Sequence, residues 1–138
     1  MNRSKSGLFL MELIIAIAFF AVASAVCIQL FATAHSLRTR SFGLQMAVAS
    51  AQSAADTFKV TGGDTYLMGE LLGAQVSGGY LISWYDDEWN PATAEQARFV
   101  MLVVTDLEAV PAMAEIVITD RLLDLEIYRL NVLRYLGV

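Results

Sequence analysis

The chain has 138 residues, of which 57% are hydrophobic and 17% are charged, and its formal net charge is −5. This excess of apolar residues excludes a mainly disordered chain, because disordered segments are poor in hydrophobic residues and rich in charge. A single cysteine excludes an intramolecular disulfide framework. The negative net charge argues against a nucleic-acid partner held by bulk electrostatics, which requires a basic surface.

The apolar excess is concentrated near the N-terminus, where residues 13–34 carry no charged side chain. As an α-helix rising about 1.5 Å per residue, this run would span about 33 Å. That length matches the hydrocarbon core of a bilayer, which is about 30 Å thick. The run therefore predicts one transmembrane helix.

Charges on the two sides of this run suggest its orientation. The leader, residues 1–7, carries Arg3 and Lys5, and the positive-inside rule then favours a cytoplasmic N-terminus and an extracytoplasmic C-terminal domain. Arg38 and Arg40 follow the run and weaken this bias. The alternative is a secretory signal peptide cleaved within residues 21–25, but the apolar run continues past those residues and a carboxylate precedes them.

That carboxylate is Glu12, which lies at the start of the apolar helix. A charged side chain at the centre of a membrane helix costs about 2.5–3.5 kcal/mol on insertion scales, and less near the interface. Either Glu12 reaches the lipid headgroups from the helix end, or it pairs with a cation that an assembly or a processing event supplies.

The segment from Lys5 to Leu13, KSGLFLMEL, resembles the processing signal of type IV pilins and pseudopilins. The resemblance implies that a prepilin peptidase cleaves after Gly7 and that Leu8 becomes the N-methylated N-terminus. It also implies that Glu12 takes the terminal amine of a neighbouring subunit. The implied partners are the peptidase, other pilin or pseudopilin subunits contacted through their N-terminal helices, and the lipid of the cytoplasmic membrane.

The pattern has a physical sense of its own. Cleavage before Leu8 creates an α-ammonium group, and helix residues four apart share a face, so this amine and Glu12 could pair within one chain as well as between chains. In surroundings of low dielectric constant such a pair penalises neighbours in the wrong register. We therefore expect Glu12 to act on assembly.

Two departures from the family pattern bear on the type of subunit. Leu8 stands where Phe is usual, and Gln29 stands where many pilins have a proline. These departures favour a minor pilin or a pseudopilin over an abundant fibre subunit. The motif is shared by type IV pili (fimbriae), type II protein secretion and competence pseudopili, so it leaves open which system is served and whether the filament is periplasmic or at the cell surface.

The transmembrane and filament-core helix is expected to comprise residues 8–34. It is expected to continue beyond the membrane as an amphipathic extension, residues 35–61. Apolar or small residues recur there at steps of three and four, which is the pattern of a helix with one buried face. The predicted stripe consists of Leu37, Ser41, Leu44, Val48, Ala51, Ala55 and Phe58. Gly62 and Gly63 provide a natural end to the helix.

The remaining region, residues 62–138, predicts a glycine-rich connection followed by a β-sheet domain. A short helix is expected at residues 65–72, begun by Asp64. Apolar and β-branched runs predict four strands, at residues 80–85, 98–107, 114–119 and 125–135. The second run is almost continuously apolar, which predicts a central strand buried on both faces. The alternation of the last run slips near Tyr128, which suggests a β-bulge.

These elements predict an α+β fold. A long N-terminal helix, with a membrane half and an amphipathic half, is expected to pack on a small, mostly antiparallel four-stranded sheet. A sheet of this size needs such a cover to be stable. The pilin resemblance implies the same architecture.

The sequence shows no catalytic set, so we expect no enzyme, cofactor or metal. Cys27 lies within the apolar run and His35 at its end, where they mark a packing position and the membrane–water boundary. An acidic cluster, Asp86, Asp87, Glu88 and Asn90, could hold Ca²⁺ through hard oxygen ligands, but it lacks EF-hand spacing and a solvated turn is the preferred interpretation.

Aromatic side chains flank this cluster. Trp84, Tyr85 and Trp89 could form an exposed contact patch or belong to the sheet core, and the core is the preferred place for Trp84.

A second hypothesis belongs to a different class of protein. The chain could be a single-pass, membrane-anchored binding or sensor protein that never enters a filament. A third hypothesis is a secreted enzyme that follows a signal peptide, but the absence of a catalytic set argues against it.

Overall fold

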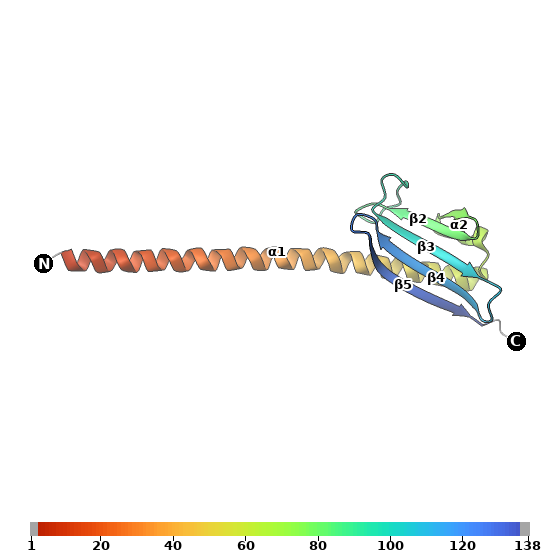
Figure 1. The fold of residues 1–138 in the computed structure, drawn as a ribbon, viewed down its shortest axis with the longest axis horizontal. Helices are drawn as coiled ribbons and strands as arrows, with labels where there is room; N and C mark the ends of the chain where they lie inside the picture. The colour runs from red at the N-terminus through yellow and green to blue at the C-terminus, as the bar shows by residue number, and fades with distance from the viewer. Residues whose placement is uncertain (1–2, 136–138) are drawn as a thin grey trace. The chain divides into compact units, whose positions relative to one another are not determined.

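The computed structural model describes residues 3–135 and has the α+β architecture that the sequence predicts, with a long N-terminal helix and an antiparallel sheet (Figure 1). Two short stretches lie outside the described part. Residues 1–2 begin the predicted leader, and residues 136–138 end the predicted sheet domain. The elements are α1 (Arg3–Thr61), α2 (Thr65–Leu72), β1 (Gln75–Ser77), β2 (Tyr80–Tyr85), β3 (Phe99–Asp106), β4 (Ala112–Asp120) and β5 (Leu125–Arg134).

The chain divides into two compact units, Met1–Ser41 and Phe42–Val138. Helix α1 continues from the first unit into the second. The first unit consists of the apolar part of this helix. The second contains the rest of α1, together with α2 and the sheet.

Helix α1 ends at Thr61, directly before the two glycines that predict its end. Gly62 and Gly63 both adopt positive φ, at 71° and 85°, which glycine tolerates without steric cost. The backbone N–H of Gly63 donates to the carbonyl of Phe58 at 3.2 Å, which satisfies one of the free carbonyls at the helix end. A side chain at Gly63 would collide with Leu107.

Helix α2 begins as predicted. Asp64 is its N-cap, and the carboxylate accepts the backbone N–H groups of Tyr66 at 3.0 Å and Leu67 at 3.2 Å. These bonds satisfy donors that the first turn of a helix leaves free.

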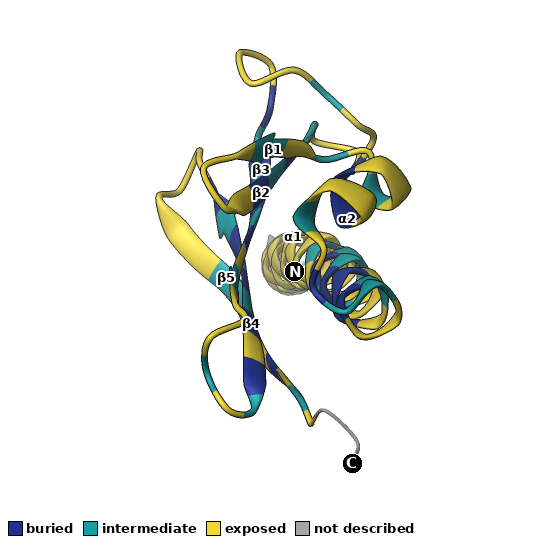
Figure 2. Cartoon of the chain, turned by 90° about the vertical axis from the view of Figure 1, so that its right-hand side faces the viewer, coloured by how far each residue is buried: buried dark blue, intermediate teal, exposed yellow. Residues whose placement is uncertain are grey.

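The face of α1 that packs on the sheet is only partly the predicted one. Ala51, Ala55 and Phe58 are buried, as expected, whereas Leu37 and Ser41 are exposed. Leu44 is exposed and Val48 is half-buried. The residues that α1 buries are Ala47, Ala51, Ala54, Ala55 and Phe58, and Figure 2 shows this buried stripe turned toward the sheet. The stripe is shorter than predicted because the sheet provides cover only from Ala47 onward.

The sheet is an antiparallel meander whose spatial order equals its chain order, β1-β2-β3-β4-β5 (Figure 1). One row of paired residues runs across its core face, through Leu81, Val103, Ile116 and Leu130. The four predicted strands correspond to β2–β5. Their ends differ from the expected ones by no more than two residues.

Strand β1 is the fifth strand, which the sequence did not predict. Gln75–Ser77 pairs with β2 across a two-residue turn, Gly78–Gly79, with φ values of 57° and 93°. Such a turn matches the twist of a hairpin and favours glycine. The strand was missed because a single apolar residue, Val76, gives no alternating run, although the glycine pair directly before β2 is a hairpin signal.

Strand β3 is central, but the prediction that both its faces are buried is wrong. Phe99, Met101 and Val103 are buried, whereas Val100 is half-buried and Val104 is 43% exposed. Within residues 3–135 the sheet has a cover on one face alone, so apolar residues on the other face are shielded only by their neighbours on adjacent strands. A continuous apolar run hides the alternation that would have revealed this.

A β-bulge interrupts the pairing of β4 with β5, within one residue of its predicted place. Ile118 pairs with Tyr128 and Thr119 with Glu126, so Ile127 is the extra residue. The extra residue reverses the alternation of the strand. Glu126 consequently points to the same face as Arg129, with which it forms an ion pair.

The core tryptophan is Trp89, and the preference for Trp84 is wrong. Trp89 is 6% exposed and its ring stacks on Phe99 with centroids 4.3 Å apart. Trp84 points to the outer face because its neighbours Ser83 and Tyr85 alternate with it along β2, and Ser83 is buried. The guanidinium group of Arg121 lies 5.4 Å from the ring centroid of Trp84.

We expect Trp89→Ala to lower the unfolding free energy by about 3–5 kcal/mol, because it opens a cavity beside Phe99. Trp84→Ala is the matched control and should cost clearly less, since its ring is half-buried on the outer face. Thermal unfolding of the full chain in detergent micelles, followed by near-ultraviolet circular dichroism, measures both. Equal losses would contradict the placement of the two rings.

Candidate functional site: the N-terminal apolar segment

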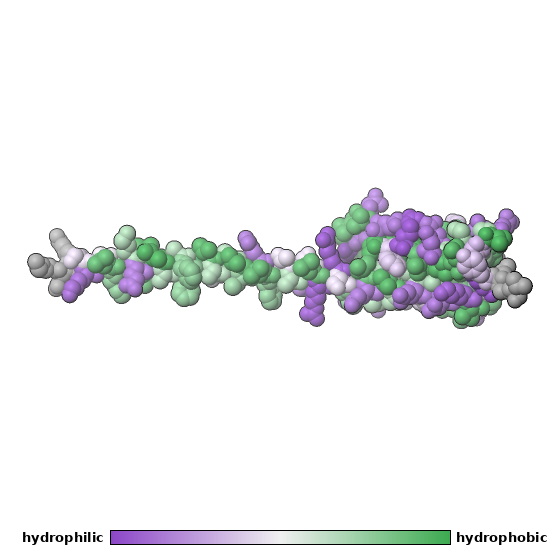
Figure 3. All heavy atoms as spheres, turned by 90° about the horizontal axis from the view of Figure 1, so that it is seen from below, coloured by the Kyte–Doolittle hydropathy of each residue, from purple (hydrophilic) through white to green (hydrophobic). Residues whose placement is uncertain are grey.

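The N-terminal part of α1 exposes apolar side chains along its whole length. Within residues 4–41 every side chain is exposed except Ala23, which is half-buried. Helix α1 is long enough and apolar enough to cross a membrane, and none of its most apolar window is buried. Figure 3 shows this part of α1 as mostly hydrophobic. An exposed apolar surface of this length is compatible with a single membrane span.

Gly7 lies within this helix, and no packing contact requires a glycine at this position. A Cβ atom built on Gly7 meets nothing within 4 Å, and its backbone is helical. Glycine inside a helix costs about 1 kcal/mol relative to alanine. The described part of the chain therefore gives no structural reason for a glycine at this position.

Leu8 and Glu12 lie one helical turn apart, four residues along the same face. Leu8 is 69% exposed and Glu12 is exposed. Among the side chains that the structure describes, no basic group forms an ion pair with Glu12. The carboxylate is thus available to a cation from outside the described chain.

Cys27 and His35 are not brought together. Both lie on α1 and are exposed, and eight residues of helix separate them by about 12 Å along the axis. Within residues 3–135, no three His, Cys, Asp or Glu side chains gather in a way that could hold a metal ion.

The acidic cluster at residues 86–90 is a hydrogen-bonded turn. The carboxylate of Asp86 accepts the backbone N–H groups of Glu88 and Asn90, both at 2.9 Å. Asp87 forms an ion pair with Arg98 at 3.2 Å. The carboxylates of Asp86 and Asp87, which could have bound a cation, are therefore used to shape the loop.

Arg98 also ties this loop to Asp120, which ends β4 beside the start of β3. Its Nη2 donates to the carboxylate of Asp120 at 3.1 Å, and Asp120 is only 3% exposed. The hydrogen bond to Asp120 raises the pKa of Arg98 further above its ordinary value. Asp120 additionally accepts the backbone N–H of Leu122 at 2.9 Å. The sequence contains a signal for this ion pair, because Arg98 directly precedes one apolar strand and Asp120 ends the next.

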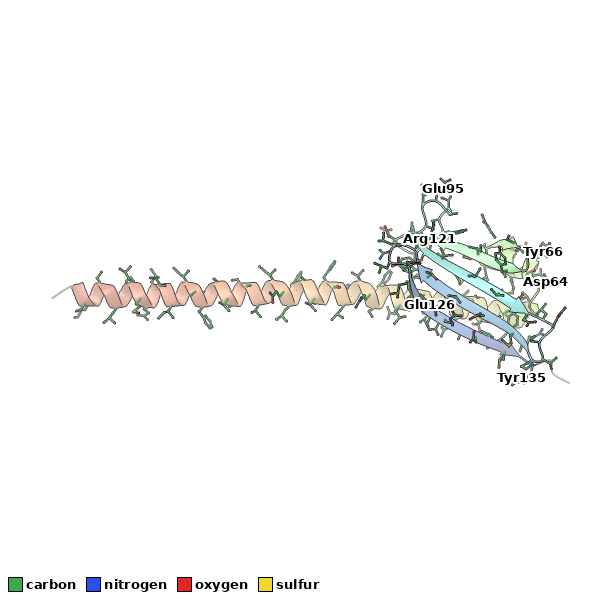
Figure 4. All side chains as sticks on the ribbon, viewed as in Figure 1. Asp64, Tyr66, Glu95, Arg121, Glu126 and Tyr135 are labelled. Atoms are coloured by element: carbon green, nitrogen blue, oxygen red, sulfur yellow. The ribbon has the colours of Figure 1, made fainter. Side chains whose placement is uncertain are left out.

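Two further arginines organise the surface of the second unit. Arg121 donates to the carbonyl of Ala97 at 3.2 Å, at the base of the loop that carries Glu95 (Figure 4). Arg129 pairs with Glu115 and Glu126 on the outer face of the sheet. Its hydrogen bonds lower the pKa of Glu126, and Glu126 raises the pKa of Arg129.

Comparisons with protein-family models, with curated proteins and with solved structures found no match for this chain.

Replacing Arg98 by Met should lower the unfolding free energy by about 2 kcal/mol, because the buried carboxylate of Asp120 then loses its charged donor. Arg129→Met is the matched control, since the same change there removes only exposed ion pairs, which contribute little. Urea unfolding of the full chain in micelles measures both variants. If Arg98→Met behaves like Arg129→Met, the Asp120 pair does not stabilise the loop.

Proposed function

We propose that the chain is a structural subunit of a type IV pilus-like filament or of a type II secretion or competence pseudopilus. In this proposal a prepilin peptidase removes residues 1–7, and the mature chain assembles through its N-terminal helix. The observation that carries the proposal is the coincidence of Gly7, Leu8 and Glu12 at the start of an exposed apolar helix.

The uncovered helix supports this function because it suits two surroundings in turn. An α-helix satisfies its backbone hydrogen bonds internally, so it can lie in lipid or among other helices without a polar penalty. Before assembly it would span the cytoplasmic membrane, with the second unit outside the cytoplasm. After assembly the same side chains would pack in the filament core. Lipid offers no hydrophobic gain between helices, so packing and polar pairs would drive their association.

Glu12 would set the register of that assembly. In surroundings of low dielectric constant, a carboxylate is strongly stabilised by an ammonium group at hydrogen-bonding distance, and an unpaired carboxylate there is costly in free energy. The α-amine that cleavage creates at Leu8 is such a group. A neighbouring subunit that offers its amine at the depth of Glu12 would be accepted, and one displaced by a turn would be penalised.

The type of subunit follows from the departures in the helix. Leu8 and Gln29 differ from the residues usual in major pilins, which favours a minor pilin or a pseudopilin. The absence of a packing reason for Gly7 supports a glycine kept for recognition by the peptidase.

The mature chain in assembled material should begin at Leu8 and carry a methyl group on its α-amine. Intact-mass spectrometry of filaments sheared from the native cell measures this directly. The Gly7→Leu variant is the control and should keep its leader. An unprocessed terminus at Met1 in assembled wild-type material would falsify the processing.

Glu12→Ala should abolish filament incorporation while leaving membrane insertion intact, because it removes the partner of the α-amine. Glu95→Ala, which removes an exposed carboxylate on a loop of the second unit, is the matched control and should assemble normally (Figure 4). Immunoblots of sheared filaments and of membranes give the two readouts. The alternative, a single-pass anchored binding or sensor protein, predicts no loss of function in Glu12→Ala.

A further inference from the structure

Gln29 is a carboxamide on the uncovered apolar part of α1, and its side chain is exposed. Two other polar residues within residues 13–34, Ser24 and Thr33, carry hydroxyl groups that can bond back to the helix. Thr39 shows that geometry, donating to the carbonyl of His35 at 3.1 Å. A carboxamide offers two donors and an acceptor, and it requires a partner beyond its own backbone.

The depth of Gln29 makes a partner important. It precedes the end of the apolar run, residue 34, by about 8 Å along the helix axis. In a hydrocarbon layer about 30 Å thick this position lies below the interface. Unpaired polar groups in such surroundings are costly, and glutamine side chains there bond between helices.

The neighbours of Gln29 on one side of its face are small. At about 100° per residue, an arc of about 80° contains Gln29 together with a set of small side chains. Within residues 18–36 these are Ala18, Ala21, Ala25, Ala32 and Ser36, whereas Val22, Val26 and Thr33 flank Gln29 on its other side. Small residues around a polar one let a second helix backbone come close enough for the polar side chains to meet. Glu12 lies about 100° away from Gln29 around the helix, and Cys27 about 160° away.

We propose that Gln29 joins two copies of this chain in the membrane, side by side and parallel, through a pair of hydrogen bonds between their carboxamides. The inference rests on the membrane-inserted state of the proposed function and goes beyond it by naming a second contact face. Two points favour a second copy as the partner. Copies inserted in the same orientation place their Gln29 side chains at the same depth, and a carboxamide is complementary to itself.

The Gln29 face and the Glu12 face have different consequences for assembly. Because they point in different directions around α1, a pair formed through Gln29 leaves Glu12 available to a further subunit. The pair does not involve the α-amine of Leu8. It therefore forms before cleavage, and the membrane-stored form of the chain is a dimer.

The test uses disulfide cross-linking of the full chain in membranes of a host that has no prepilin peptidase and no assembly machinery. Ala25→Cys is introduced with Cys27→Ala, which places the thiol on the Gln29 face. The wild-type chain, with its native Cys27 on the opposite side of the helix, is the matched control. Copper phenanthroline is the oxidant, and non-reducing gels measure the dimer.

We expect the Ala25→Cys chain to form a covalent dimer and the wild-type chain to remain mostly monomeric. Adding Gln29→Leu should reduce the Ala25→Cys dimer about fivefold, and Gln29→Asn, which keeps a carboxamide, should retain more of it. Membrane levels of each variant establish that insertion is unchanged. Equal cross-linking from both faces, or cross-linking at Ala25 that is insensitive to Gln29→Leu, would overturn the proposal.

This outcome is independent of the filament. The host cannot process the leader, so a failed cross-link rejects the Gln29 pair and leaves the mass of the mature terminus to decide on processing. Conversely, an unprocessed terminus in native filaments rejects the cleavage and leaves the cross-linking result standing.

Discussion

The second unit depends on the contact between the small stripe of α1 and the core face of the sheet. A meander of short strands has an apolar face that must be covered, and α1 supplies the cover. Ala47, Ala51 and Ala54 bring the helix backbone close to the sheet, and Phe58 fills the space where the helix ends. The cover is one-sided, which leaves apolar residues of β3 half-exposed on the outer face.

Two carboxylates show how differently the two units treat a charge among apolar side chains. Asp120 is buried and the fold brings Arg98 to it from the start of the preceding strand. Glu12 lies on an apolar helix and receives no ion pair from any described side chain. Membrane helices rarely retain a carboxylate without a use. This contrast supports a partner for Glu12 that another molecule, or a newly made terminus, provides.

Much of the fold was predictable because its signals are local. The end of α1 follows from two glycines that accept positive φ, and the start of α2 from Asp64. Strands β2–β5 follow from apolar and β-branched runs that are longer than chance groupings of apolar residues. The choice of Gly7, Leu8 and Glu12 as candidate residues rests on the resemblance of residues 5–13 to a pilin processing signal, and their role stays a prediction. The structure adds that they lie on a helix that nothing in the described chain covers.

The sequence by itself determined the order and type of most elements, the long apolar helix and the position of its carboxylate. Only the tertiary structure decided that β3 is buried on one face, that Trp89 enters the core in place of Trp84, and that Arg98 pairs with Asp120. The reason is physical. Helix ends and strand periodicity arise from interactions between near neighbours, whereas these three features depend on which distant segments a turn or a covering helix brings into contact.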